Sequence, residues 1–304
     1  MLAAVLLVAA AVPRLLPQPI AGTAVLASIP GPPAVGACVT PPADGWHPGR
    51  RVRGELTYPP TTTRPCSSSR DGEVIATIPA AEVIRPLATG ADPTSDVDRN
   101  ADRCNAELNS YLGLAAASSP VAQTVWQPLA TLATTVAGPT ALQRAFGQHW
   151  LSCIAYVAGV DGAGVGYGRS LRAGYTSGRL PAAAARCLLT ADPQLPTPVP
   201  CSTPHQAEFF GSGWSATPVT ALTPTCRQLV QHLTGMPDPT AGGALTIETA
   251  QQRVQIVTFD AGGTSTVGRP TGQTLVPVCL VAVSAHHALA GPLVDLGSAP
   301  VPWA

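Results

Sequence analysis

Residues 65–76 read PCSSSRDGEVIA, and residues 200–211 read the related phrase PCSTPHQAEFFG. In each phrase a glutamate lies seven residues after the cysteine, as Glu73 in the first phrase and Glu208 in the second. Self-similarity of this kind indicates an internal duplication, so we expect two copies of one domain. The eight cysteines of the 304-residue chain divide around the phrases into two equal sets: Cys38, Cys66, Cys104 and Cys153, then Cys187, Cys201, Cys226 and Cys279.

The sequence around the cysteines predicts the same succession of elements in each copy. The first cysteine of each set lies in a short apolar stretch, VGACVT or ARCLLT, and the fourth lies in a longer one, WLSCIAYVAG or LVPVCLVAV. Such stretches are typical of strands. The third cysteine shares one helical face with nearby leucines, as Cys104 does with Leu108 and Leu112. These patterns predict an α+β fold of two related small domains, each with a short antiparallel sheet and one helix, stapled by disulfides.

The patterns also divide the chain into segments. A stretch rich in Gly, Ser and Arg separates the two copies and is typical of a linker. The expected segments are a leader at 1–30, repeat 1 at 31–159, the linker at 160–183, repeat 2 at 184–290 and a tail at 291–304.

Disulfides explain the cysteines better than metal binding or catalysis does. A structural zinc site uses close pairs such as C-x-x-C, and no two cysteines here are close neighbours in the sequence. A catalytic thiol requires one activated cysteine, not a repeated set of four. Four cysteines allow three pairings within a repeat, of which first-with-fourth is the main alternative to the one we favour. The favoured pairs are Cys38–Cys66, Cys104–Cys153, Cys187–Cys201 and Cys226–Cys279.

An apolar run at residues 2–12 opens the chain. It is shorter than the roughly 20 residues of a transmembrane helix, and its length suits the core of a signal peptide. No basic residue precedes it, so it is either a signal peptide that lacks its basic start or part of a longer membrane anchor. A buried helix is disfavoured because Pro13, Pro17 and Pro19 would break it. With the even number of cysteines, the run predicts an extracytoplasmic protein, secreted or tethered to the membrane through its N-terminal segment.

Charge is sparse and balanced in this chain. Charged residues make up 11% of the sequence, and 17 basic residues offset 17 acidic ones. A net charge of zero provides no overall field for attracting nucleic acid, so we expect no nucleic-acid partner. All of the basic residues are arginine, which together with the excess of alanine and proline indicates a GC-rich genome.

Four residues are candidates for a binding site. His205 and Glu208 lie three residues apart in the second phrase, where they could bind a ligand or satisfy backbone groups of the turn. Because the glutamate recurs in the first phrase without the histidine, we favour a structural role for it. Trp46 and Trp214 lie near expected turns, where an exposed indole would mark a surface for a partner.

Known catalytic and nucleotide-binding motifs are absent from the sequence. There is no G-x-S-x-G or H-E-x-x-H motif, and the chain has no lysine for a phosphate-binding loop. The glycine-rich run at residues 159–168 has Tyr167 where a dinucleotide fingerprint requires its third glycine. We therefore expect no catalytic residue, no metal site and no cofactor, and the chain is expected not to be an enzyme.

The phrase CSTPHQAE at residues 201–208 resembles the signature of the septum-formation domain family, whose members are extracytoplasmic domains of high-GC Gram-positive bacteria, often tethered to the membrane. The resemblance extends over both copies. Repeat 1 departs from the signature because Ser69 and Arg70 replace Pro204 and His205, which implies that any family function lies beside Cys201.

The resemblance implies a role in the cell envelope. We expect a non-catalytic, exported or membrane-tethered module that binds a protein or a cell-wall partner in septum formation or cell division. One alternative is an envelope hydrolase or transferase with a site built from loops. Another alternative is a structural spacer.

Overall fold

The computed structural model describes most of the chain beyond the leader, and residues 31–304 form one compact unit. Residues 1–28 and Trp214 lie outside the described residues. No described helix has the length and apolar character that crossing a membrane would require. The described ranges are 29–42, 45–46, 50–52, 55–66, 69–82, 93–114, 126–127, 131–192, 197–213, 219–257, 270–283 and 287–304.

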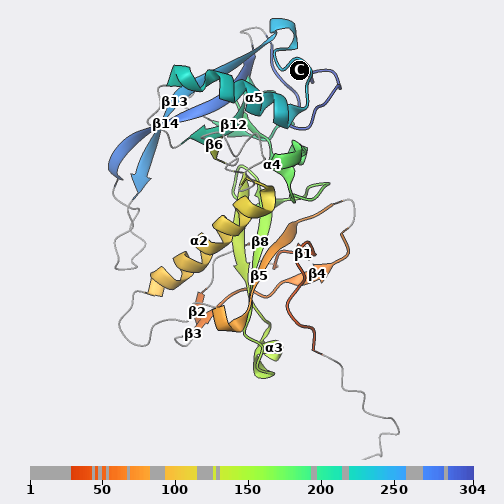
Figure 1. Ribbon diagram of the computed structural model, residues 1–304, viewed down its shortest axis with the longest axis vertical. Helices are drawn as coiled ribbons and strands as arrows, with labels where there is room; N and C mark the ends of the chain where they lie inside the picture. Colours follow the sequence, from red (N-terminus) through yellow and green to blue (C-terminus); the bar gives the residue numbers. More distant parts are fainter. Residues whose placement is uncertain are drawn as a thin grey trace, which may run out of the picture. The chain divides into compact units, whose positions relative to one another are not determined.

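Repeat 1 folds into an antiparallel sheet with the strand order β4-β1-β5-β8-β7, and the long helix α2 lies against β5, β7 and β8 (Figure 1). The short strand β9 extends the sheet beside β8, while β2 and β3 form a separate two-stranded ribbon. The elements are β1 (Cys38–Thr40), β2 (Arg50–Val52), β3 (Glu55–Thr57), β4 (Thr62–Arg64), β5 (Gly72–Ile78), η1 (Ala80–Glu82), α2 (Pro93–Leu112), β7 (Leu132–Ala137), α3 (Ala141–Ala145), β8 (Leu151–Ala158) and β9 (Gly164–Val165).

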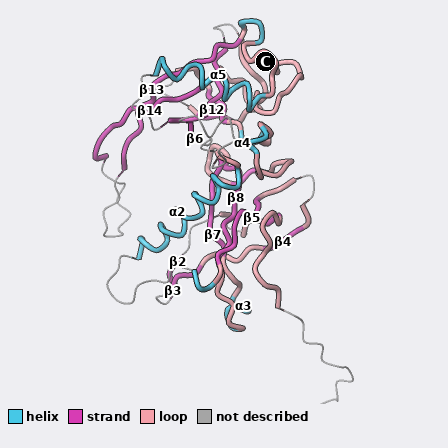
Figure 2. The backbone as a smooth tube through the Cα atoms, in the orientation of Figure 1, coloured by secondary structure: helices cyan, strands magenta, loops and turns pink. Residues whose placement is uncertain are grey.

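Repeat 2 forms a second antiparallel sheet with the strand order β11-β10-β12-β14-β13, and helix α5 packs on β12, β13 and β14 (Figure 2). Strand β6, which follows α2 in the chain, joins this second sheet beside β12. The elements are β6 (Trp126–Gln127), α4 (Gly174–Ser177), η2 (Ala182–Ala184), β10 (Arg186–Leu188), β11 (Pro198–Val199), β12 (Ala207–Gly213), η3 (Val219–Leu222), α5 (Thr223–Thr234), η4 (Ala241–Gly243), β13 (Leu245–Val257) and β14 (Pro270–Val283).

The two sheets repeat each other in register as well as in strand order. Cys38 lies opposite Glu73 in the first sheet, and Cys187 lies opposite Glu208 in the second. Two positions beyond each of these glutamates, β5 and β12 carry a register irregularity in their pairing with β8 and β14. We call β8 and β14, which carry the fourth cysteine of each set, the closing strands. The fold is therefore α+β with two sheet-based units of the same design, as the paired phrases predict.

Two disulfides join the elements of each unit. In each repeat one bond joins the first strand to the cysteine of the Pro-Cys-Ser phrase, and the other joins the helix to the closing strand. The helix-to-strand bonds are fully buried at both ends. The pairs are Cys38–Cys66, Cys104–Cys153, Cys187–Cys201 and Cys226–Cys279, which is the pairing favoured from the sequence.

A single hydrophobic cluster contains buried residues from both repeats. The buried Trp126 links the repeats within this cluster. It lies on β6, which comes from repeat 1 and pairs with β12 of repeat 2, and its Nε1 donates a hydrogen bond to Thr225 Oγ1 at 3.2 Å. Residues 160–183, expected to act as a linker, connect the two sheets and are themselves packed, with Leu171, Tyr175 and Leu180 almost fully buried.

Gly178 of this connecting segment lies close against α5. Its φ of 66° lies in the left-handed region, and a Cβ at this position would overlap the carbonyl oxygen of His232. We expect Gly178→Ala to lower the free energy of unfolding by about 2 kcal/mol in urea denaturation, because backbone strain and steric overlap add together. Gly147→Ala is the matched control, since its φ is 80° but no atom lies within 4 Å of the added carbon. An equal cost for both variants would contradict a contribution from the overlap.

Candidate functional site

Glu208 lies on β12 and is fully buried, where it fixes the C-terminal segment of the chain. Its Oε2 accepts a hydrogen bond from the backbone N–H of Leu293 at 2.6 Å, and its Oε1 accepts one from Val294 at 3.2 Å. Burial raises the pKa of the Glu208 carboxyl to about 7, although the two backbone N–H groups favour its charged form. The side chain therefore stabilises the segment that follows the closing strand.

Glu73 has the same role in repeat 1. Its Oε2 accepts a hydrogen bond from the backbone N–H of Leu171 at 2.9 Å, and its Oε1 accepts one from Ser170 Oγ at 2.5 Å. Arg70 adds an ion pair to Oε1 at 3.2 Å. Because both glutamates hold the chain segment beyond the closing strand, their recurrence has a structural explanation.

His205 is also buried, with 1% of its surface exposed. Its backbone pairs with Leu289 of the C-terminal segment, and its Nδ1 lies 2.8 Å from the carbonyl oxygen of Thr203. Burial lowers the pKa of His205 below its usual value, so the imidazole is neutral near pH 7. In this structure neither His205 nor Glu208 is exposed enough to touch a partner directly.

Cys187, His205 and Glu208 bring three potential ligand atoms together. The Sγ of Cys187, a ring nitrogen of His205 and a carboxylate oxygen of Glu208 lie within 4.8 Å of one another. In the oxidised chain the sulfur belongs to the disulfide with Cys201, so it is not a thiolate that could bind a metal.

Trp46 packs on the sheet of repeat 1. It contacts a small apolar cluster that includes Val39 and Ile154, and its ring centroid lies 5.7 Å from that of Tyr156. Gly72 allows this packing, because a Cβ there would lie 2.8 Å from the indole ring. Trp46 is partly buried and serves at least in part to cover the sheet, whereas its expected companion Trp214 is outside the described residues.

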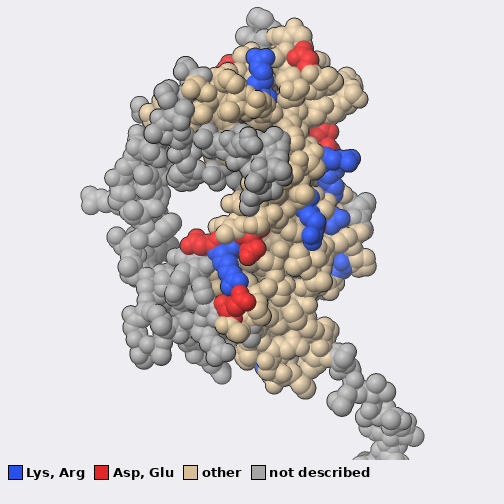
Figure 3. Space-filling view, in the orientation of Figure 1, with Lys and Arg blue, Asp and Glu red and all other residues tan. Residues whose placement is uncertain are grey.

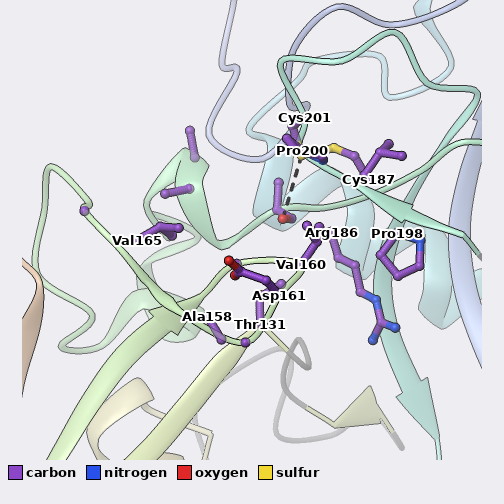
Figure 4. Close-up of a pocket in the computed structure, with 17 residues that line it drawn as sticks. Thr131, Ala158, Val160, Asp161, Val165, Arg186, Cys187, Pro198, Pro200 and Cys201 are labelled. Carbon is purple, nitrogen blue, oxygen red and sulfur yellow. Dashed lines mark hydrogen bonds between the residues drawn. A yellow bond between two sulfur atoms is a disulfide. The ribbon is translucent and has the colours of Figure 1, made fainter. Parts of the chain in front are cut away.

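A pocket of about 610 Å³ lies between the two repeats (Figure 4). Its walls come from the end of β8 and the glycine-rich turn that follows, from η2, and from β10 and β11. The Cys187–Cys201 disulfide forms part of the wall. Two stretches discussed from the sequence line the pocket, the glycine-rich run at residues 159–168 and Pro200-Cys201, but neither indicated a pocket. The other lining residues come from well-separated segments.

The pocket is mainly apolar, and one cation, Arg186, and one anion, Asp161, are among the residues that line it. Arg186 places its guanidinium 5.4 Å from the centre of the Phe209 ring, and burial lowers its pKa. None of the carboxylates in the described part of the chain forms an ion pair with it. The carboxylate of Asp161 accepts the backbone N–H of Ala163 at 2.9 Å.

The described lining residues lack a nucleophile next to a base. They include no histidine, and the one threonine, Thr131, donates its hydroxyl to the carbonyl oxygen of Ala184. On the face of the molecule in Figure 3, most of the described surface carries neither acidic nor basic side chains. The arrangement suits binding of a mainly apolar ligand better than it suits chemistry on a bound substrate.

Comparisons with known proteins identify no relative: no family model, no curated protein and no solved structure matches this chain.

Proposed function

We propose that this chain is a non-catalytic binding module of the cell envelope. Four disulfides in a chain of this size indicate an extracytoplasmic location, because thiols are kept reduced in the cytosol. The two repeats share one core and enclose a pocket between them, so the duplication supplies a site that neither copy has alone.

The pocket is the observation that carries this proposal. Its volume of about 610 Å³ lies within the range of roughly 300–1,000 Å³ that is common for ligand sites. The guanidinium of Arg186 is partly buried and pairs with no described carboxylate, so it favours a ligand or a protein segment that places a carboxylate or phosphate beside it. The apolar walls would receive the rest of that ligand.

A role at the division septum is the finer part of the proposal. It is supported by the resemblance of the phrase at residues 201–208, which runs from the pocket wall at Cys201 to the buried Glu208. The N-terminal apolar run would export the module or hold it at the membrane.

Affinity capture from envelope extracts tests the proposal with the full chain and its disulfides intact. Ala183→Trp would fill the pocket from an exposed wall position, and Ala145→Trp adds the same bulk at an exposed position of α3 outside the pocket. We expect the unmodified chain and Ala145→Trp to recover the same partner, and Ala183→Trp to recover at least tenfold less. Recovery of the partner by all three proteins would contradict binding in the pocket, and no reproducible partner for any of them would favour a structural spacer.

A further inference from the structure

The two repeats differ at one position next to the recurring glutamate. In repeat 1 the guanidinium of Arg70 lies 3.2 Å from Cys38 Sγ and 3.2 Å from Glu73 Oε1, so a cation occupies the space between sulfur and carboxylate. In repeat 2 the corresponding residue is His205, which lies four residues after the second cysteine as Arg70 does. No described cationic side chain pairs with Glu208.

His205 is oriented as a metal-binding histidine would be. Its Nδ1 can donate to the carbonyl oxygen of Thr203, which leaves the lone pair on Nε2. Nε2 is buried and has no hydrogen-bond partner among the described residues. A buried imidazole nitrogen without a partner is costly unless something binds it.

The other two donors are also in place. Glu208 is held by two backbone N–H groups, as ligating carboxylates commonly are, and retains lone pairs for a metal. In a tetrahedral zinc site a nitrogen ligand and a sulfur ligand lie about 3.5 Å apart. The three potential ligand atoms here lie within 4.8 Å of one another, so binding a metal would require them to move closer by about 1 Å. One thiolate and one carboxylate would neutralise a divalent cation, which suits a buried site.

The Cys187–Cys201 disulfide is accessible from the pocket. Cys187 and Cys201 both line the pocket, and Cys201 is only half-buried. By contrast, both helix-to-strand disulfides are buried at each end. The Cys187–Cys201 bond also closes the shortest loop of the four, 14 residues, so its opening releases the least chain entropy.

We propose that repeat 2 contains a redox-gated divalent-metal site made of Cys187, His205 and Glu208, which becomes available when a dithiol reductant opens the Cys187–Cys201 bond. A thiolate of the dithiol attacks Cys201 Sγ, and Cys187 leaves as a thiolate. The second thiol of the reductant then displaces Cys201 as a thiol. The dithiol loses two electrons and becomes a cyclic disulfide, the protein disulfide gains them, and the Cys187 thiolate binds the metal.

Cobalt(II) titration of the full-length Cys201→Ser variant tests this proposal, because the substitution frees Cys187 without a reductant. We expect one equivalent of Co²⁺ to bind with a thiolate-to-metal charge-transfer band in the near ultraviolet, and the oxidised unmodified chain to show none. Adding His205→Ala to the variant should weaken binding at least 100-fold. Absence of the band in Cys201→Ser, or a band that persists unchanged without His205, would overturn the proposal.

Repeat 1 provides the matched control. Cys66→Ser frees Cys38 beside Glu73, but Arg70 already occupies the space, so no Co²⁺ band is expected. A band of equal strength in Cys66→Ser would show that any freed thiol suffices and would overturn the proposal. If Cys201→Ser lacks a folded near-ultraviolet circular dichroism signal without metal, Co²⁺ must restore that signal together with the band; failure to do so counts against the site.

Discussion

Removal of the Cys226–Cys279 bond by the double substitution Cys226→Ala and Cys279→Ala is expected to lower the free energy of unfolding by about 4 kcal/mol or more. The bond closes a loop of 53 residues, for which the chain-entropy model gives about 4 kcal/mol. Both sulfurs are completely buried between α5 and β14, so lost packing adds to the entropic cost. Urea denaturation under non-reducing conditions measures the change.

The Cys187–Cys201 bond is the comparison within the same repeat. Its loop has 14 residues, so the same model gives about 3 kcal/mol, and Cys201 is half-buried. The double alanine variant at these positions should therefore be more stable than the variant without Cys226–Cys279. The reverse order would show that strain or residual structure in the unfolded chain, not loop length and burial, determines what each disulfide contributes.

The duplication and the elements around the cysteines could be predicted because their signals are local. An apolar stretch around Cys153 or Cys279 indicates a strand by its composition, and the spacing of Cys104, Leu108 and Leu112 indicates a helical face. The shared contexts of the two cysteine sets then transfer each inference from one copy to the other. The antiparallel sheets and the helix on each follow from these signals, whereas the disulfide pairing was one of three possibilities and the structure agrees with the favoured one.

The pocket and the packing between the repeats could not be predicted in the same way. Trp126 has no distinctive context in the sequence, yet it lies on a strand that joins the sheet of the other repeat. Residues 160–183 have the composition of an exposed linker, but their glycines allow close approach, as at Gly178 against α5. Both features depend on contacts between segments far apart in the chain, which local composition does not encode.

The stability of this protein should also depend on the protonation of Glu208. Its pKa is about 7 in the folded chain and near 4.5 when unfolded, so the folded state binds more protons between these values. Stability from this group is therefore fully present below about pH 4.5 and is lost as the pH rises through 7. The shift corresponds to about 3 kcal/mol across this window.

Glu208→Gln isolates this contribution, because the amide cannot ionise. His205, whose lowered pKa makes it oppose Glu208 below about pH 6.5, is present in both proteins and largely cancels in the comparison. We expect the free energy of unfolding of the unmodified chain, minus that of Glu208→Gln, to be at least 2 kcal/mol larger at pH 5 than at pH 8. A difference that stays constant with pH would show that Glu208 is not protonated on folding.

The same substitution in repeat 1 should behave differently. Glu73→Gln leaves the partly buried guanidinium of Arg70 without its carboxylate, so at pH 8 it should be more destabilising than Glu208→Gln, which loses one of two backbone hydrogen bonds but also removes a buried charge. Denaturation of both variants at pH 8 makes the comparison directly. A larger cost for Glu208→Gln would show that the two backbone hydrogen bonds of Glu208 contribute more to stability than the burial of its charge costs.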